Sequence, residues 1–210
     1  MKRYAVIAAL ALVAVAPLVA QAPKGWMVRA DRSTSATDPD GAGTIKFVTM
    51  GTGFHATNPA AAVFWNPANT ATGNYSLKAS FILQKPSGHT NYYGLVFGGE
   101  GLEGPRQSYT YFLVAQDGTW LIKKRNGDSG PDSVKDVAPK TPNDAVRKPD
   151  DTGKSTNALE VRVGGDKIDY VVNGTVVHTM PKTGVKTDGI YGIRVNHLLE
   201  VHVDRFAVTK

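Results

Sequence analysis

The chain has 210 residues, no cysteine and a formal net charge of +6. The absence of cysteine excludes disulfide frameworks, thiol catalysis and metal sites built from thiolates. The charges of both signs are interspersed, and the longest basic run is only Lys123–Arg125. We therefore expect no nucleic-acid partner.

Residues 1–22 have the pattern of a secretory signal peptide. Lys2 and Arg3 precede an apolar run from Tyr4 to Ala20, and the small residue Ala22 follows. A charged start, an apolar middle and small residues at the exit are typical of such a peptide. The apolar run is short for a membrane span, and no second run follows. We predict export to the periplasm or the medium, with cleavage after Ala20 or Ala22 and no membrane span.

Strand signals dominate the chain from residue 23 onward, and no segment keeps the 3.6-residue apolar period of a helix. The polar segments Ala30–Gly43 and Asn126–Asn157 are predicted loops, and the second is long enough to hide a short edge strand near Val134–Val137. Residues 23–210 are predicted to form one all-β domain, an antiparallel sandwich or barrel. Eleven strands are predicted: Ile45–Val48, Ala61–Trp65, Tyr75–Leu83, Tyr92–Phe97, Ser108–Ala115, Thr119–Arg125, Ala158–Val163, Lys167–Val172, Thr175–Thr179, Ile190–Val195 and Leu199–Val208.

The pair Asn173-Gly174 predicts a hairpin with a two-residue type I′ turn, because both residues tolerate positive φ. This register places Val172 opposite Thr175 and Asp169 opposite His178. An aspartate beside a histidine resembles half of a catalytic pair. We interpret it as an exposed cross-strand ion pair, because no serine or second acid is placed beside it.

The pair Asp117-Gly118 predicts a second hairpin, in which Ala115 lies opposite Trp120 and Tyr111 opposite Lys124. A bulge would shift this register by one residue. Aromatic rings on a sheet face can stack against sugars while their polar tips bind hydroxyl groups. The alternative is that these rings are core residues. The predicted ligand-binding residues share one face of this hairpin: Tyr109, Tyr111, Trp120 and Lys124.

Five segments taken together resemble the concanavalin A-like lectin/glucanase sandwich. They are YYGLVFGGE, SYTYFLVAQDGTWLIKKR, NALEVRVGGDKIDYVVNGTVVHTM, GIYGIRV and VHVDRFAV. The resemblance covers roughly Tyr75 to Val208. Within that group the chain is similar to bacterial secreted laminin-G-like and 3-keto-disaccharide hydrolase-type domains. The resemblance implies an antiparallel two-sheet jelly-roll sandwich. It does not fix the activity, since the same fold hosts lectins, glycosidases, lyases and adhesion modules.

The acidic residues do not follow the pattern of the glucanases of this group, whose carboxylates alternate along one strand toward the cleft. Glu100 and Glu103 lie in a glycine-rich segment instead. Glu200, His202 and Asp204 do alternate, and three polar groups on one face are able to bind a metal or perform acid–base chemistry. We interpret them as the solvent-facing side of an outer strand. No catalytic residue is assigned, and we lean against an enzyme.

Two acidic segments, Asp38–Gly41 and Asp128–Asp136, offer oxygen ligands of the kind that calcium takes. Neither is a dense ligand run, so no metal-binding residue is assigned and no cofactor is expected, with calcium left open. The sequence predicts an exported, non-catalytic carbohydrate-binding domain whose partner is a glycan or cell-envelope polysaccharide. The alternatives are a hydrolase of the 3-keto-disaccharide type and a structural or adhesion domain of the envelope. The oligomeric state is left open.

Overall fold

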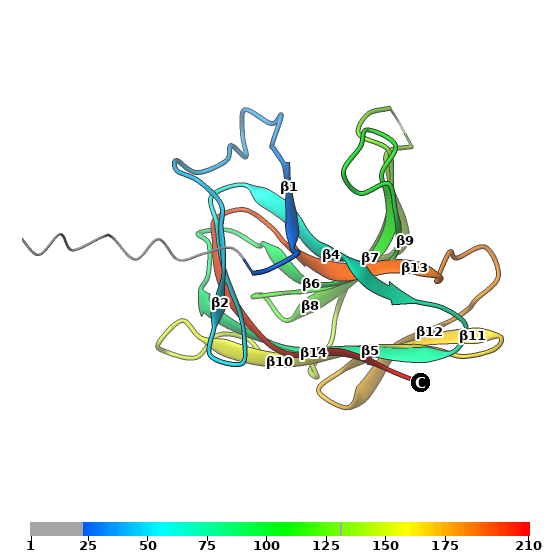
Figure 1. Cartoon of the computed structure of the whole chain (residues 1–210). Coiled ribbons are helices and arrows are strands. Elements are labelled where there is room, and N and C mark those ends of the chain that lie inside the picture. The colour runs from blue at the N-terminus through cyan, green and yellow to red at the C-terminus, as the bar shows by residue number, and fades with distance from the viewer. Residues whose placement is uncertain (1–22, 131) are drawn as a thin grey trace, which may run out of the picture.

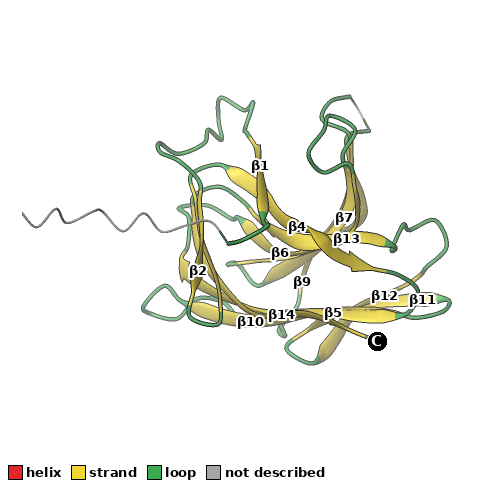
Figure 2. Ribbon diagram, viewed as in Figure 1, coloured by secondary structure: helices red, strands yellow, loops and turns green. Residues whose placement is uncertain are grey.

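The computed structural model describes residues 23–130 and 132–210, and the predicted signal peptide lies outside them. The described residues form fourteen strands and contain no helix (Figure 2). Accordingly, none of them belongs to a helix long and apolar enough to cross a membrane. The strands form two stacked antiparallel sheets of seven strands each, here named sheet A and sheet B (Figure 1).

Both sheets bring together strands from distant parts of the chain. In spatial order, sheet A consists of β1 (Met27–Asp31), β4 (Ala61–Ala71), β13 (Gly189–Val195), β6 (Tyr92–Glu100), β7 (Ser108–Ala115), β8 (Thr119–Asn126) and β9 (Val134–Pro142). Sheet B consists of β12 (Thr175–Pro181), β11 (Lys167–Val172), β10 (Ser155–Val163), β5 (Tyr75–Lys85), β14 (Leu199–Thr209), β3 (Gly53–Asn58) and β2 (Lys46–Met50).

The main core lies between the sheets and follows the two-residue period of the strands. Leu77 and Phe81 of β5 point inward, while Lys78 between them is exposed. From sheet A, Phe64 and Phe112 point into the same core. Because alternate side chains of a strand lie on opposite faces, this pattern buries one face of each sheet against the other. The predicted all-β, antiparallel, two-sheet sandwich is confirmed.

All eleven predicted strands are present, and the edge strand expected near Val134–Val137 is β9. Two strands were missed. Strand β1 carries no clear alternation and overlaps the start of the segment that was predicted to be a loop. Strand β3 follows β2 through a turn at Gly51, whose φ of 59° favours glycine, and its mixed composition hid it.

The β11–β12 hairpin turns at Asn173-Gly174 with φ values of 50° and 86°, as a type I′ turn requires. The predicted pair of Val172 with Thr175 is correct, but an irregularity between Tyr170 and Val171 shifts the pairs beyond it by one residue. Asp169 therefore lies opposite Thr179, whose hydroxyl donates a hydrogen bond of 2.7 Å to it. The predicted pairing of Asp169 with His178 was wrong, because a bulge changes the register of every pair beyond it.

Glu200, His202 and Asp204 lie on the outer face of sheet B, but β14 is a central strand between β5 and β3. The interpretation as an outer strand was therefore wrong. Both charged ends of this row are paired: His55 Nε2 lies 3.0 Å from Glu200 Oε1, and His202 Nε2 lies 3.2 Å from Asp204 Oδ2. The pairs give each histidine a local structural partner.

Candidate functional site

The β7–β8 hairpin decides which side chains reach the outer face of sheet A. Its loop has three residues rather than two, and Gly118 at its end has a φ of 85°. Trp120 consequently pairs with Val114, and Tyr111 pairs with Lys123. A three-residue loop that ends in a left-handed glycine is a common hairpin geometry, and it moves the register by one residue from the prediction.

This shift separates the four predicted ligand-binding residues. Tyr109 and Tyr111 point to the outer face of sheet A, where they join a second apolar cluster. Trp120 is only 3% exposed and belongs to the main core, with its ring 5.3 Å from that of His178. Lys124 pairs with Thr110, so the alternation along β8 places Lys124 on the same face of sheet A as Trp120, away from Tyr109 and Tyr111. The prediction that all four share one face was wrong.

The outer face of sheet A carries a layer of buried apolar side chains, here named the outer floor. It consists of Val63, Trp65, Val96, Tyr109, Tyr111, Leu113 and Leu121. None of them is more than 6% exposed, although they point away from the main core. The outward face of a sandwich sheet is normally polar. The outer floor is therefore a feature that needs its own explanation.

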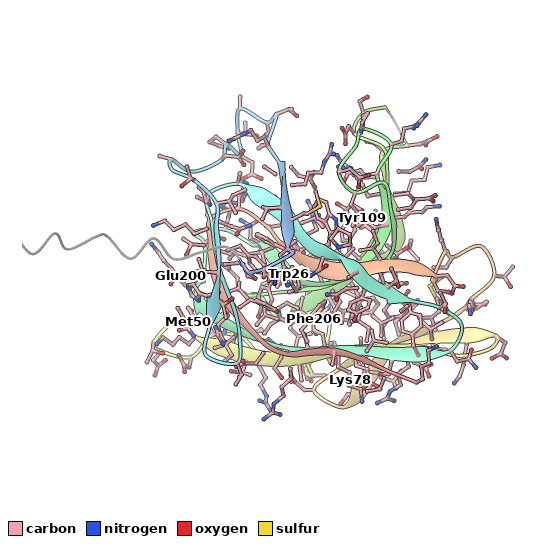
Figure 3. The ribbon with its side chains drawn as sticks, viewed as in Figure 1. Trp26, Met50, Lys78, Tyr109, Glu200 and Phe206 are labelled. Carbon is pink, nitrogen blue, oxygen red and sulfur yellow. The ribbon has the colours of Figure 1, made fainter. Side chains whose placement is uncertain are left out.

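Strand β1 and the loops after β6 and β8 rise around this floor. In Figure 1, β1 stands on one side of sheet A and the ends of β7 and β9 on the other, and the Tyr109 side chain labelled in Figure 3 lies between them. Leu102 of the β6–β7 loop packs on the floor. Arg29 of β1 contacts both loops. Its Nη1 donates to the carbonyl of Gly104 in the β6–β7 loop at 2.9 Å, and its Nη2 pairs with Asp128 in the β8–β9 loop at 2.5 Å.

A buried charge network crosses the outer floor. Arg194 of β13 forms an ion pair with Asp31 of β1, and its Nη1 donates to the Tyr109 hydroxyl at 3.0 Å. The guanidinium carbon lies 5.2 Å from the centre of the Tyr111 ring, a cation–π distance. Arg125 of β8 approaches the second oxygen of Asp31 at 3.8 Å. One carboxylate thus joins two guanidinium groups from strands far apart in the sheet.

These contacts fix the protonation states of the network. Burial raises the pKa of the Asp31 carboxyl, but Arg194, Arg125 and Arg29 outweigh it and hold the pKa below its ordinary value. Burial also raises the pKa of the Tyr109 hydroxyl, which therefore stays neutral. The site presents an ionised carboxylate, charged guanidinium groups and neutral phenols.

Next to this network the floor opens into a hollow of about 190 Å³. It is lined by Tyr92, Tyr111, Leu113, Leu121, Lys123, Arg194 and Asn196. The Asn196 Oδ1 atom is buried and has no hydrogen-bond partner within the described protein. A buried acceptor without a donor costs about 1–3 kcal/mol, and this atom, which is inaccessible to solvent, meets a bound group only if the Asn196 side chain moves.

Sequence reasoning found Tyr109 and Tyr111 but missed Asp31, Arg194 and Asn196. One signal was present, because Arg194 interrupts the apolar strand Ile190–Val195. A charged residue inside a buried strand calls for a partner of opposite charge. That partner, Asp31, lies in a strand that was not predicted, and so the pair could not be assigned.

A second, larger hollow of about 670 Å³ lies where loops meet at the strand ends. Many of its lining residues are glycine, alanine or proline, including Gly41, Ala42, Pro59 and Gly88. The lining also includes charged side chains, Lys46, Lys85 and Glu200, but no aromatic ring from the described residues. The outer floor, with its aromatic rings and charge network, is therefore the stronger candidate for specific binding.

No family model matches the sequence. No curated protein matches it either. Among solved structures, the chain is similar to a carbohydrate-binding module, CBM66, from Bacillus subtilis, with a TM-score of 0.62 and 10% identity, covering 89% of this chain and 96% of the module. It is also similar to a GH16 protein of a mixed-linkage glucan locus from Bacteroides ovatus, with a TM-score of 0.58 and 9% identity, covering 88% and 94%.

A third similar structure is described as a putative glycosyl hydrolase from Parabacteroides distasonis, with a TM-score of 0.53 and 14% identity, covering 78% of this chain and 89% of that one. At these identities the likeness concerns the fold and leaves the activity open. The neighbours include both a binding module and glycoside-acting proteins. The chain has the sandwich fold of the concanavalin A-like lectins and glucanases, as the resemblance in its sequence implied.

Proposed function

We propose that this protein is an exported, non-catalytic carbohydrate-binding protein and that it binds its glycan on the outer floor of sheet A. The observation that carries the proposal is the hollow beside Arg194. There an aromatic ring (Tyr111), two cationic side chains (Arg194 and Lys123) and an amide side chain (Asn196) line one hollow. The similarity of the fold to that of a carbohydrate-binding module also supports carbohydrate binding.

The chemistry of the hollow matches that of a sugar. A sugar ring has an apolar face that packs on an aromatic ring and a rim of hydroxyl groups that both donate and accept hydrogen bonds. The Lys123 ammonium and the Arg194 guanidinium offer donors to the oxygens of a sugar. Arg194 has several N–H groups, so it can donate to a sugar while it keeps its ion pair with Asp31.

The volume of the hollow limits what it holds. Pockets for drug-sized ligands span roughly 300–1,000 Å³, and this hollow has about 190 Å³. It therefore suits a single sugar unit, such as the end of a chain, better than a long stretch of polysaccharide. The β6–β7 loop already covers part of the floor through Leu102.

Two features favour binding without catalysis. Glycoside hydrolysis commonly needs two carboxyl groups, one of which keeps its proton through a raised pKa. The pKa of Asp31 is instead lowered by three arginines. Asp128, the other carboxylate of this network, is engaged by Arg29 and by a hydrogen bond of 2.6 Å from Gln107 Nε2. Neither is arranged as a general acid.

A glycan-array screen of the purified protein tests the proposal, followed by calorimetric titration with the best ligand. We expect Lys123→Ala to weaken binding at least fivefold, because the variant removes donors from the hollow. The matched control is Lys78→Ala on the outer face of sheet B, which we expect to bind like the parent protein. Equal binding by all three proteins, or no binding to any glycan, contradicts the proposal. Release of sugar from the bound glycan contradicts its non-catalytic part.

The export part of the proposal rests on residues 1–22 and has its own test. Expression of the full chain in a bacterial host, followed by mass spectrometry of the exported protein, reads the cleavage site directly. We expect a mature chain that begins at Gln21 or Pro23. Uncleaved protein that stays in the cytoplasm contradicts export and leaves the glycan-binding proposal intact.

A further inference from the structure

Three loops bring two histidines and one aspartate together at one end of the sandwich. Asp38 comes from the loop between β1 and β2, His89 from the loop between β5 and β6, and His197 from the turn between β13 and β14. Asp38 Oδ1 lies 2.9 Å from His89 Nε2 and 3.2 Å from His197 Nε2, and the two Nε2 atoms are 3.1 Å apart. Three potential ligand atoms thus form a small triangle.

Hydrogen bonding alone does not account for this triangle. An imidazole nitrogen carries either one proton or one lone pair. If only His89 Nε2 is protonated, the His197 lone pair faces the oxygen of Asp38. If both nitrogens are protonated, their N–H groups face each other at 3.1 Å. If only His197 Nε2 is protonated, the His89 lone pair accepts from Asn91 Nδ2 at 3.0 Å but also faces the oxygen of Asp38 at 2.9 Å. Each arrangement leaves one repulsive contact, whereas a cation that sits above the triangle accepts a lone pair from all three atoms and replaces the Asn91 amide as the partner of His89.

The distances between the three potential ligand atoms agree with those between neighbouring ligands of a transition-metal ion. Metal–nitrogen bonds of about 2.0–2.1 Å place neighbouring ligand atoms about 2.9 Å apart in octahedral geometry and about 3.3 Å apart in tetrahedral geometry. The three observed separations lie within this interval. Calcium prefers six to eight oxygen ligands, so the two imidazoles favour a first-row transition metal over the calcium that the sequence of Asp38–Gly41 left open.

A second carboxylate orients the buried histidine. Asp40 Oδ1 lies 3.4 Å from His197 Nδ1, and Asp40 Oδ2 accepts a hydrogen bond of 3.1 Å from the backbone N–H of Ser33. A carboxylate on the far nitrogen of a metal-binding histidine fixes the tautomer that leaves Nε2 free to bind. The His197 side chain is 7% exposed, so its orientation is held by the protein around it.

The loop that carries Asp38 is shaped by its own hydrogen bonds. The Ser33 hydroxyl donates to the carbonyl of Asp38 at 2.6 Å, and the Asp38 N–H donates to the Ser35 hydroxyl at 3.2 Å. Further along, the Gly41 N–H donates to the carbonyl of Pro59 at 2.8 Å, which ties the loop to the end of sheet B. The aspartate is therefore presented by an ordered turn.

We propose that Asp38, His89 and His197 bind one divalent first-row transition-metal ion, with Asp40 as the positioning residue of His197. The ion joins three loops that are distant in sequence. Three protein ligands leave at least one coordination position for water or an oxygen of a ligand. The larger hollow is lined by the same loops, through Gly41, Gly88 and Leu198, so an open position there lies beside it.

Calorimetric titration of the purified protein with zinc chloride, after removal of metals with a chelator, tests this proposal. We expect one zinc ion per chain, and an increase in melting temperature on zinc addition because the ion binds the folded state. His89→Ala should weaken zinc binding at least tenfold and abolish the increase in melting temperature. The His89 side chain is 45% exposed, so this variant should stay folded.

His202→Ala is the matched control, because His202 also contacts an aspartate but lies on sheet B. It should leave the zinc stoichiometry and affinity unchanged. Asp40→Ala should keep the stoichiometry and weaken the affinity about 10- to 100-fold, as expected for a residue that acts through a ligand. Asp38→Asn, at an exposed position, provides a second ligand variant. The proposal is overturned if the parent protein binds no zinc, or if the His89 and Asp38 variants bind it as the parent does.

Discussion

The outward faces of the two sheets are built on opposite principles. On sheet B, most outer side chains of β5 and β10 are polar and partly or fully exposed, as in the row of Lys78, Glu160 and Arg162. On sheet A, the outer floor is apolar, and the charges of Asp31 and Arg194 are buried at 9% and 11% exposure. A face that only has to meet water needs no buried charge pair. This difference supports the proposal that the protein binds its glycan on the outer floor.

The largest expected effect comes from breaking the buried pair on sheet A. Asp31→Ala leaves the Arg194 guanidinium without its main counter-charge, in a site that excludes water. Removing one partner of a buried pair costs about 3–5 kcal/mol, and we expect a loss of that size in the free energy of unfolding measured with urea. A loss below about 1 kcal/mol would show that the pair is solvated, which contradicts the contrast between the two faces.

A smaller effect is expected from the apolar part of the outer floor. Leu113 is buried there, and Leu113→Ala should cost about 2–4 kcal/mol in the free energy of unfolding. The matched position on the outer face of sheet B is Ile82, which is only partly buried. Ile82→Ala should cost about 1 kcal/mol. If both variants lose the same stability, the outer floor is no more tightly packed than the outer face of sheet B.

Acid should weaken the polar face of sheet B through Glu160. Burial raises the pKa of its carboxyl, but hydrogen bonds from Arg162, Ser76 and Lys78 outweigh burial and lower the pKa to about 2. The folded-state pKa lies below the unfolded value of about 4.3, so this carboxylate stabilises the fold above that pH. The contribution is lost as the pH falls from there toward 2.

Glu160→Gln measures this contribution. Its ion pairs with exposed partners are worth about 1 kcal/mol or less, so at pH 7 the variant should be less stable than the parent by about that amount. Urea unfolding at each pH measures the difference in the free energy of unfolding between the two proteins. This difference should shrink as the pH falls from 4.5 to 2.5. A difference that stays constant over this range excludes Glu160 as a source of acid sensitivity.

The smallest effect on stability is expected from the two surface lysines used as binding probes. Lys123 pairs with Asp136 at 3.1 Å, and Lys78 pairs with Glu160 at 3.1 Å. Both side chains are partly exposed, so each alanine variant should change the free energy of unfolding by less than about 0.5 kcal/mol. Glycan binding should separate the two variants where stability does not. A large loss of stability in Lys123→Ala alone would make it unsuitable as a binding probe.

The sequence predicted the architecture because the two-residue period decides which strand faces are buried, and this period is plain in segments such as Tyr75–Leu83. It predicted the site poorly because one residue of register exchanges the two faces of a strand. At Asp117-Gly118 the pattern allowed a two-residue or a three-residue loop. The prediction took the two-residue loop, and its register placed Trp120 on the predicted binding face instead of in the core.

The charge network and the full set of Asp38, His89 and His197 were not predicted for a different reason, although Asp38 was named as a possible calcium ligand. Their members come from elements that only the folded topology brings together, such as Asp31 with Arg194 or Asp38 with His197. Each residue alone looks like an ordinary surface charge or a lone histidine. No local pattern in a single sequence reports on a contact across 163 positions, which is the separation of Asp31 and Arg194.

The most direct test of the binding face is amide hydrogen exchange with and without the best glycan from the array. We predict that the glycan slows exchange in β7, β8 and β13, the strands that carry Tyr111, Lys123 and Arg194, and leaves β5 and β10 of sheet B unchanged. If the glycan slowed exchange only in sheet B, or in neither sheet, the assignment of glycan binding to the outer floor would be contradicted.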